Sequence, residues 1–133
     1  MHYSVAYTPA AASLTGYASN ATGASWPLSV TTAGDGLAHT TTIRNDSATD
    51  HSAKTAVITG TDADGIAQTE TMALPAGTST TTGLKYFLTI STIVPSATID
   101  ADTMDLGWTA VSYSPSLQLN YRQNQFHVSL GVV

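Results

Sequence analysis

The stretch "VITGTDADGIAQTETMALPAG", residues 57–77, decides how the fold is interpreted. Its centre, Gly60 to Gly65, carries two aspartates at alternate positions before a glycine, and threonine-rich runs lie on both sides. Such a centre is either the front of a calcium-binding loop or a tight turn between two strands. The first would give the chain a chemical site, whereas the second would make this region a structural hairpin.

A calcium loop of the EF-hand type places oxygen ligands at its first, third and fifth positions, a glycine at its sixth and a glutamate at its twelfth. With Gly65 sixth, Gly60 becomes the first residue and Thr71 the twelfth, and both are wrong. A start at Asp62 also fails, because an isoleucine then becomes the fifth residue. We therefore predict a hairpin turn in which Asp64 and Gly65 supply the positive φ. A weak calcium site of another type, at Asp62 and Asp64, is the alternative.

The composition predicts an all-β protein. Only 10% of the residues are charged and 42% are hydrophobic, while the sequence contains 23 Thr and 14 Ser. Threonine, valine and isoleucine suit a pleated, half-buried surface, whereas disordered chains are usually rich in charge. The length of 133 residues supports one ordinary domain and leaves room for an arm attached to it.

The charge and the lack of cysteine exclude several classes of partner and site. A net charge of -5 with four Lys and Arg argues against binding nucleic acid or an anionic membrane. No cysteine is present, so disulfides and thiolate metal sites are excluded. The start lacks the pattern of a signal peptide, and no run approaches the roughly 20 apolar residues of a membrane span. We expect synthesis in the cytosol and a homo-oligomer that gains stability by packing against neighbours.

Short runs of alternating apolar and polar residues predict about seven strands. We expect strands at residues 3–7, 40–43, 55–59, 68–74, 84–94 and 104–108, where the run 84–94 is one strand or two divided near Ser91. Residues 117–122 and 126–131 alternate as well and predict a terminal hairpin. Apolar residues nowhere keep a helical period for three turns. The pattern therefore favours a β-sandwich.

The segment from Pro9 to Asp35 is rich in Ala, Ser, Gly and Thr, and its only bulky cluster is Trp26-Pro27-Leu28. We expect an extended arm or long loop that Trp26 and Leu28 anchor, with a flexible, partly ordered terminus as the alternative. The predicted organisation is an N-terminal strand and arm over residues 1–36, followed by a sandwich domain over residues 37–133.

A second acidic group contains Asp100, Asp102 and Asp105. In an extended chain Asp100 and Asp102 face the same way and could share a hard cation, although acids in such loops are more often simply solvated. None of the four histidines belongs to a pair with metal-ligand spacing, so surface or packing roles are expected for them. They are His2, His39, His51 and His127.

No motif predicts catalysis. The sequence has no Gly-x-Ser-x-Gly motif and no glycine-rich phosphate loop, and Glu70 is its only glutamate. Four aromatic residues could form a sugar-binding platform, but in a β domain poor in large residues a place in the core is the favoured expectation for them: Trp26, Tyr86, Trp108 and Tyr121. We expect a protein that is not an enzyme and that carries no cofactor and no resident metal.

Two runs resemble structural proteins of tailed bacteriophages. The run "AVITGTDADGIAQTETMALPAGTSTTTGLKYFLTISTIVPSA", residues 56–97, is similar to a recurring phage segment with a Gly-Thr-Asp-x-x-Gly turn and a Thr-Glu-Thr strand. In that segment a leucine-proline stop and a strand with a lysine-aromatic pair follow, here Leu74-Pro75 and Lys85-Tyr86. The run "LQLNYRQNQFHVSLGVV", residues 117–133, resembles another run of phage virion proteins. The resemblance implies an immunoglobulin-like or related β-sandwich and a role in the virion.

Within that family the expected role is a decoration or cement subunit, which binds the major capsid protein on the outer head and is assembled in the host cytoplasm. The alternatives are a tail, baseplate or neck subunit and, from another class, a carbohydrate-binding module for the host surface. The resemblance brings no catalytic residues. The residues expected to contact neighbours are Trp26, Leu28, Phe126, Val128 and Leu130.

Overall fold

The computed structural model describes residues 5–116, and all its regular structure is β. None of the described residues forms a helix that could cross a membrane. The seven strands are β1 (Ser13–Thr22), β2 (Ala38–Asn45), β3 (Thr55–Thr61), β4 (Ala67–Ala73), β5 (Thr80–Phe87), β6 (Thr89–Pro95) and β7 (Thr103–Tyr113).

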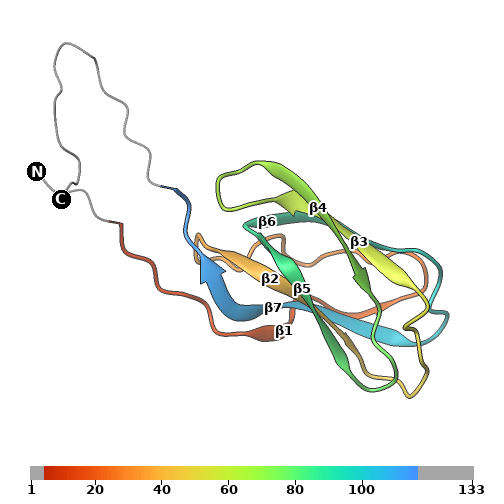
Figure 1. Ribbon diagram of the computed structural model, residues 1–133. Coiled ribbons are helices and arrows are strands. Elements are labelled where there is room, and N and C mark those ends of the chain that lie inside the picture. The colour runs from red at the N-terminus through yellow and green to blue at the C-terminus, as the bar shows by residue number, and fades with distance from the viewer. Residues whose placement is uncertain (1–4, 117–133) are drawn as a thin grey trace, which may run out of the picture.

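The strands form two antiparallel sheets that pack face to face as a sandwich (Figure 1). The four-stranded sheet has the order β1-β7-β2-β5, and the three-stranded sheet has the order β4-β3-β6. The prediction of an all-β sandwich is confirmed. A constant-type immunoglobulin domain also pairs its second strand with its fifth and its third with its sixth. In this chain β4 and β7 have changed sheets relative to that arrangement.

The strands predicted between residues 40 and 108 are confirmed. β3 alternates between more and less buried positions, as expected of a strand with one face in the core, whereas β2 and the first half of β7 are buried almost throughout. The apolar run at 84–94 is two strands, and they divide at Leu88 rather than near Ser91. β5 and β6 belong to different sheets, so the chain crosses the sandwich between Phe87 and Ile90, which are both buried.

The predicted arm is wrong in its extent. Residues 13–22 form β1, which pairs with β7, so the sandwich begins at Ser13 and the expected boundary at residue 36 lies inside it. The small side chains of β1 show no alternation of apolar and polar residues, so the sequence does not predict this strand. Ala18 and Ala21 are nevertheless buried, because β1 lies against β7 in the sheet. Residues 5–12 do extend away from the sheets as an arm (Figure 1), and residues 5–7 are not a strand.

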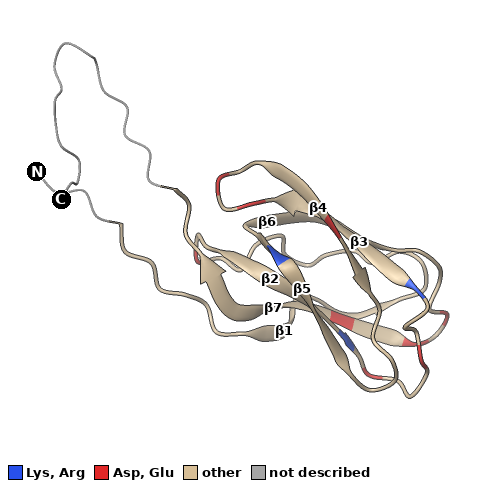
Figure 2. Ribbon diagram, in the orientation of Figure 1, with Lys and Arg blue, Asp and Glu red and all other residues tan. Residues whose placement is uncertain are grey.

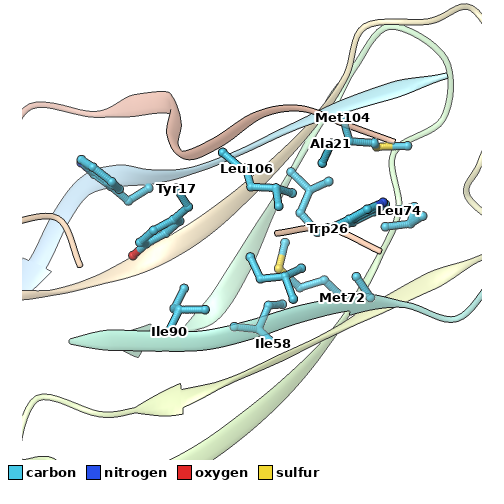
Figure 3. Packing of buried hydrophobic residues seen from close by; sticks show 14 of the residues in the cluster. Tyr17, Ala21, Trp26, Ile58, Met72, Leu74, Ile90, Met104 and Leu106 are labelled. Carbon is cyan, nitrogen blue, oxygen red and sulfur yellow. The ribbon is translucent and has the colours of Figure 1, made fainter. Parts of the chain in front are cut away.

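The core lies between the two sheets (Figure 3). Tyr17 and Leu106 approach it from the four-stranded sheet, and Ile58 and Ile90 approach it from the three-stranded sheet. Trp26 enters it from the connection after β1. Aliphatic and aromatic side chains from nearly every element meet here, so the loop after β1 is as much part of the core as the strands are.

Backbone from the connection after β1 covers part of the edges of β1 and β6. Backbone N–H groups of Ser29 and Val30 donate to the carbonyl of Tyr17 in β1, and Ile90 N–H in β6 donates to the carbonyl of Thr31. On the other side a groove of about 560 Å³ separates β4 from β5. There the Glu70 carboxylate accepts the N–H groups of Leu84 and Lys85, each at 2.6 Å. Covered edges protect a sheet from pairing with foreign strands.

The two ends of the sandwich differ. We call the arm end the one where residues 35–37, the β3–β4 turn and the end of β7 lie, and the arm leaves there (Figure 1). We call the charged end the one formed by residues 44–54 and 95–102. Most Asp, Lys and Arg residues of the described chain gather toward the charged end (Figure 2).

Candidate functional site

The turn between β3 and β4 is a hairpin turn, as predicted, but Gly65 alone has the positive φ that was expected of Asp64 as well. Gly65 has a φ of 82°, and Asp62 N–H donates to the carbonyl of Ile66 at 2.9 Å. One carboxylate oxygen of Asp62 accepts the backbone N–H groups of Asp64 and Ile66, both at 2.9 Å. The Asp62 carboxylate therefore serves the turn itself, which is the usual use of aspartate in turns.

Asp64 ties the chain after β7 to this turn. Its carboxylate accepts the backbone N–H of Ser116 at 2.7 Å and the Ser116 hydroxyl at 3.1 Å. Both aspartates of the opening motif are thus engaged by N–H and O–H donors of the chain.

Asp100 and Asp102 do not face the same way in an extended segment. Asp100 has a φ of 55° and lies in a turn, and Asp102 N–H donates to the carbonyl of Ile99 at 3.1 Å. A turn rotates successive side chains away from the alternation of a strand, so the prediction that the two acids share a face is wrong. Among residues 5–116 no group of three His, Asp or Glu side chains could hold a metal ion.

Asp102 instead pairs with His51 at the charged end. The distance from its carboxylate to His51 Nε2 is 2.9 Å, and Lys54 Nζ lies 3.3 Å from His51 Nδ1. Hydrogen bonds from His51 and Thr49 hold the pKa of Asp102 below its usual range. Because an ammonium only donates, Nδ1 of His51 faces a donor, whereas Nε2 faces the Asp102 carboxylate. The group joins residues 49–54 to the loop before β7.

Of the residues expected to contact neighbours, Trp26 is only 5% exposed and belongs to the chain's own core. Its indole N–H donates to the carbonyl of Gly23 at 3.3 Å. Leu28 is partly buried and packs against the same core. The prediction for Trp26 is wrong because the segment after β1 folds back on its own sandwich. Phe126, Val128, Leu130 and the predicted terminal hairpin lie outside the described residues.

The aromatic residues among those described do not form a sugar-binding platform. Trp108 is only 9% exposed, and its ring packs edge-on against Tyr17 with centroids 4.9 Å apart. Tyr86 is half-buried and packs against Tyr113 at 4.8 Å. Trp26 and Trp108 are core residues, as favoured for aromatic residues in a small β domain. Tyr121 lies outside the described residues.

The best-organised polar cluster is one that the sequence did not reveal. Asp35 lies between two glycines with positive φ, Gly34 at 82° and Gly36 at 77°. This short loop, which glycine permits at no steric cost, turns the Asp35 carboxylate toward the sandwich. One carboxylate oxygen accepts Leu37 N–H at 3.0 Å, and the other lies 2.7 Å from Nε2 of His39.

His39 is fully buried, and both of its ring nitrogens face acceptors. Nδ1 lies 2.8 Å from the carbonyl oxygen of Thr109, and Nε2 lies against the Asp35 carboxylate. Burial acts to raise the pKa of Asp35, but N–H groups of Ala10, Leu37 and His39 outweigh it and hold this pKa below the usual range. Both nitrogens of the ring are thus engaged by oxygen atoms, one from the Asp35 carboxylate and one from the backbone.

This pair holds the N-terminal arm. Ala10 N–H donates to Asp35 at 2.7 Å, and the indole N–H of Trp108 donates to the carbonyl of Ala11 at 3.0 Å. The Tyr7 ring lies against Gly36, with its nearest carbon 3.3 Å from where a Cβ would stand. We call Asp35, His39 and Trp108 the arm clasp. It binds the arm mainly through main-chain atoms.

A signal for the arm clasp does exist in the sequence. Asp35 precedes His39 by four residues, and glycines flank Asp35 on both sides. That pattern marks a turn with a carboxylate at its tip, but Trp108 and the acceptor on Thr109 come from the far end of the chain. Spacing alone therefore could not identify the cluster.

Comparison with known proteins identifies no relative. No protein-family model matches the chain, and no curated protein and no solved structure matches it either.

Proposed function

We propose that this protein is a non-enzymatic structural subunit of a phage virion, and that it decorates and stabilises the outer capsid. The observation that carries the proposal is the arm. It is fastened at its base by the arm clasp, while its outer part stands away from the sandwich (Figure 1). A fastened but projecting segment is suited to contact a neighbouring subunit.

Exposed apolar side chains at the arm end support a partner there. Val5 on the arm is 62% exposed, and Tyr113 at the end of β7 is 61% exposed. Val111 in the same strand is exposed as well. Apolar groups that remain in solvent at one end of a small domain are typical of contact surfaces. A capsid protein or a further copy of this chain would cover them.

The charge distribution supports an outer position. The net charge of -5 disfavours a place against packaged DNA, whose phosphates would repel the subunit. The fixed groups at the charged end, the His51–Asp102 pair among them, join loops to one another and present no open ligand set in the described residues. These features suit a subunit that holds its neighbours together rather than one that binds a small ligand. They support the same role in the virion as the resemblance of residues 56–97 to phage proteins.

The decisive measurement is the number of copies per particle, from electron microscopy and quantitative mass spectrometry of purified virions. The proposal expects a number near that of the major capsid protein. A few to a dozen copies would contradict the decoration role and would instead indicate a tail, baseplate or neck subunit.

A binding experiment tests the arm. Purified capsids that lack the protein are incubated with the full chain or with a variant that lacks residues 1–9. The deletion stops before Ala10, so the bonds of Ala10 and Ala11 to the arm clasp and the sandwich from Ser13 onward are kept. Loss of capsid binding by a variant that still folds is the expected result. Unchanged binding and unchanged capsid stability would exclude the arm as a clamp.

A further inference from the structure

The arm clasp recognises a short stretch of extended backbone. Asp35 accepts an N–H from Ala10, and Trp108 donates to the carbonyl of Ala11, the next residue. Because a donor and an acceptor of neighbouring residues are bound, the contacts require an extended segment but no particular side chain at either position. The sequence Pro9-Ala10-Ala11-Ala12 meets this need with small side chains.

The arm is otherwise weakly attached. Residues 5–12 belong to no strand, so no ladder of backbone hydrogen bonds joins them to either sheet. The contacts found along them are the Ala10 and Ala11 hydrogen bonds and the packing of Tyr7 on Gly36. The bonds to Ala10 and Ala11 lie outside β1, so breaking them would leave the pairing of β1 with β7 intact.

We propose that the arm clasp is an exchange site, in which the arm of one copy occupies the clasp of a second copy. The structure shows that this site fits this segment, so a second copy brings a ligand that already matches. Exchange of identical elements replaces each contact with the same contact, which is why swapping is a low-cost route to association. The chain leaves the sandwich at the arm end, so exchange there would bring the exposed Val5 and Tyr113 of two copies together.

The arm of the same chain competes for the site, because a short tether gives it a high effective concentration. Exchange therefore dominates where copies are held side by side, as on a surface or in a ring. The inference concerns copies of this chain alone, so it stands whether or not the protein belongs to a virion.

Two full-length variants separate exchange from binding within one chain. In Ala10→Pro the residue has no N–H to donate, so its own arm is a poor ligand while its clasp is intact. In Asp35→Asn the arm is intact while the clasp has lost its carboxylate. Neither variant alone can form the complete contact, but a mixture can form it between the arm of Asp35→Asn and the clasp of Ala10→Pro.

The readout uses the absence of cysteine in the sequence. Asp35→Asn also carries Ala12→Cys with a spin label, and Ala10→Pro is labelled with ¹⁵N. We expect the label to broaden the amide signals of residues 35–39 in the partner, and a dimer to sediment in the mixture but not in either variant alone. The affinity should fall about tenfold or more when Asp35→Asn is added to the acceptor, because a charge-assisted hydrogen bond is lost.

Folding is checked in the same spectra, since the β2 and β7 amide shifts report the sandwich of each variant. With both variants folded, an absence of broadening and of dimer would overturn the exchange. Broadening that survives Asp35→Asn in the acceptor would overturn the role of the clasp. Neither result would alter the count of copies per virion, so failure of this inference is separate from failure of the proposed function.

Discussion

The two ends of the sandwich each contain a histidine paired with an aspartate, yet the two pairs differ in burial and in what they hold. At the arm end, His39 and Asp35 are 2.7 Å apart, with side chains 0% and 6% exposed. At the charged end, His51 and Asp102 are 2.9 Å apart, and the Asp102 side chain is 29% exposed. The first pair fastens the arm, whereas the second fastens one loop to another.

The third group around each ring explains the difference. His39 has the carbonyl of Thr109 on its other nitrogen, so both of its nitrogens face acceptors. His51 has the ammonium of Lys54 there, so that nitrogen faces a donor. Both rings are buried, and the two aspartates differ in exposure. Two pairs of the same residue types are therefore expected to differ in their contribution to stability.

The largest effect is expected for tryptophan removal. Trp108→Ala should lower the free energy of unfolding by about 3–5 kcal/mol, as is usual for a large aromatic residue removed from a core. Trp26→Ala should cost a similar amount, because Trp26 is equally buried. Only Trp108→Ala should also free the arm, seen as faster amide exchange at Ala10. Urea unfolding and hydrogen exchange measure both, and equal exchange in the two variants would show that Trp108 does not hold the arm.

The histidine pairs are compared directly by His39→Leu and His51→Leu. His39→Leu leaves the nearly buried Asp35 carboxylate without its hydrogen bond to His39, which should cost about 3 kcal/mol. His51→Leu leaves Asp102 partly in water, so about 1 kcal/mol is expected. Chemical denaturation of the two variants gives the difference. Equal losses would mean that burial does not distinguish the pairs.

The smallest effect is expected from acid. Hydrogen bonds lower the pKa of Asp35 and of Asp102 in the folded chain. A carboxyl group with a lower pKa when folded adds stability that is present above its unfolded pKa of about 4 and is lost as the pH falls through its folded pKa. Urea midpoints at neutral pH and below about pH 4 should therefore show a loss in the wild type that is smaller in Asp35→Asn and in Asp102→Asn. A loss of the same size in both variants would assign acid sensitivity to other carboxyl groups.

Local patterns predicted much of the sandwich. The alternation in residues 55–59 and 68–74 was read correctly as two strands, and the Asp64-Gly65 turn between them needed only backbone geometry and a glycine. β1 was missed because its small residues carry no apolar period, and only pairing with β7 shows that Ala18 and Ala21 are buried. The candidate site was missed for a related reason. The spacing between histidines in the sequence does not reveal the site, because His39 contacts Asp35 on a loop and the carbonyl of Thr109 on a distant strand.

By itself the sequence determined what depends on near neighbours along the chain: β structure, the central hairpin turn, and the absence of disulfides. The tertiary structure alone decided that Trp26 packs inward, that β5 and β6 belong to different sheets, and that the arm is fastened at its base. The physical reason is distance along the chain. The indole of Trp108 reaches Ala11 across 97 positions, and Asp35 reaches Ala10 across 25. Such contacts exist only after the sheets have formed and have excluded water from the groups that meet there.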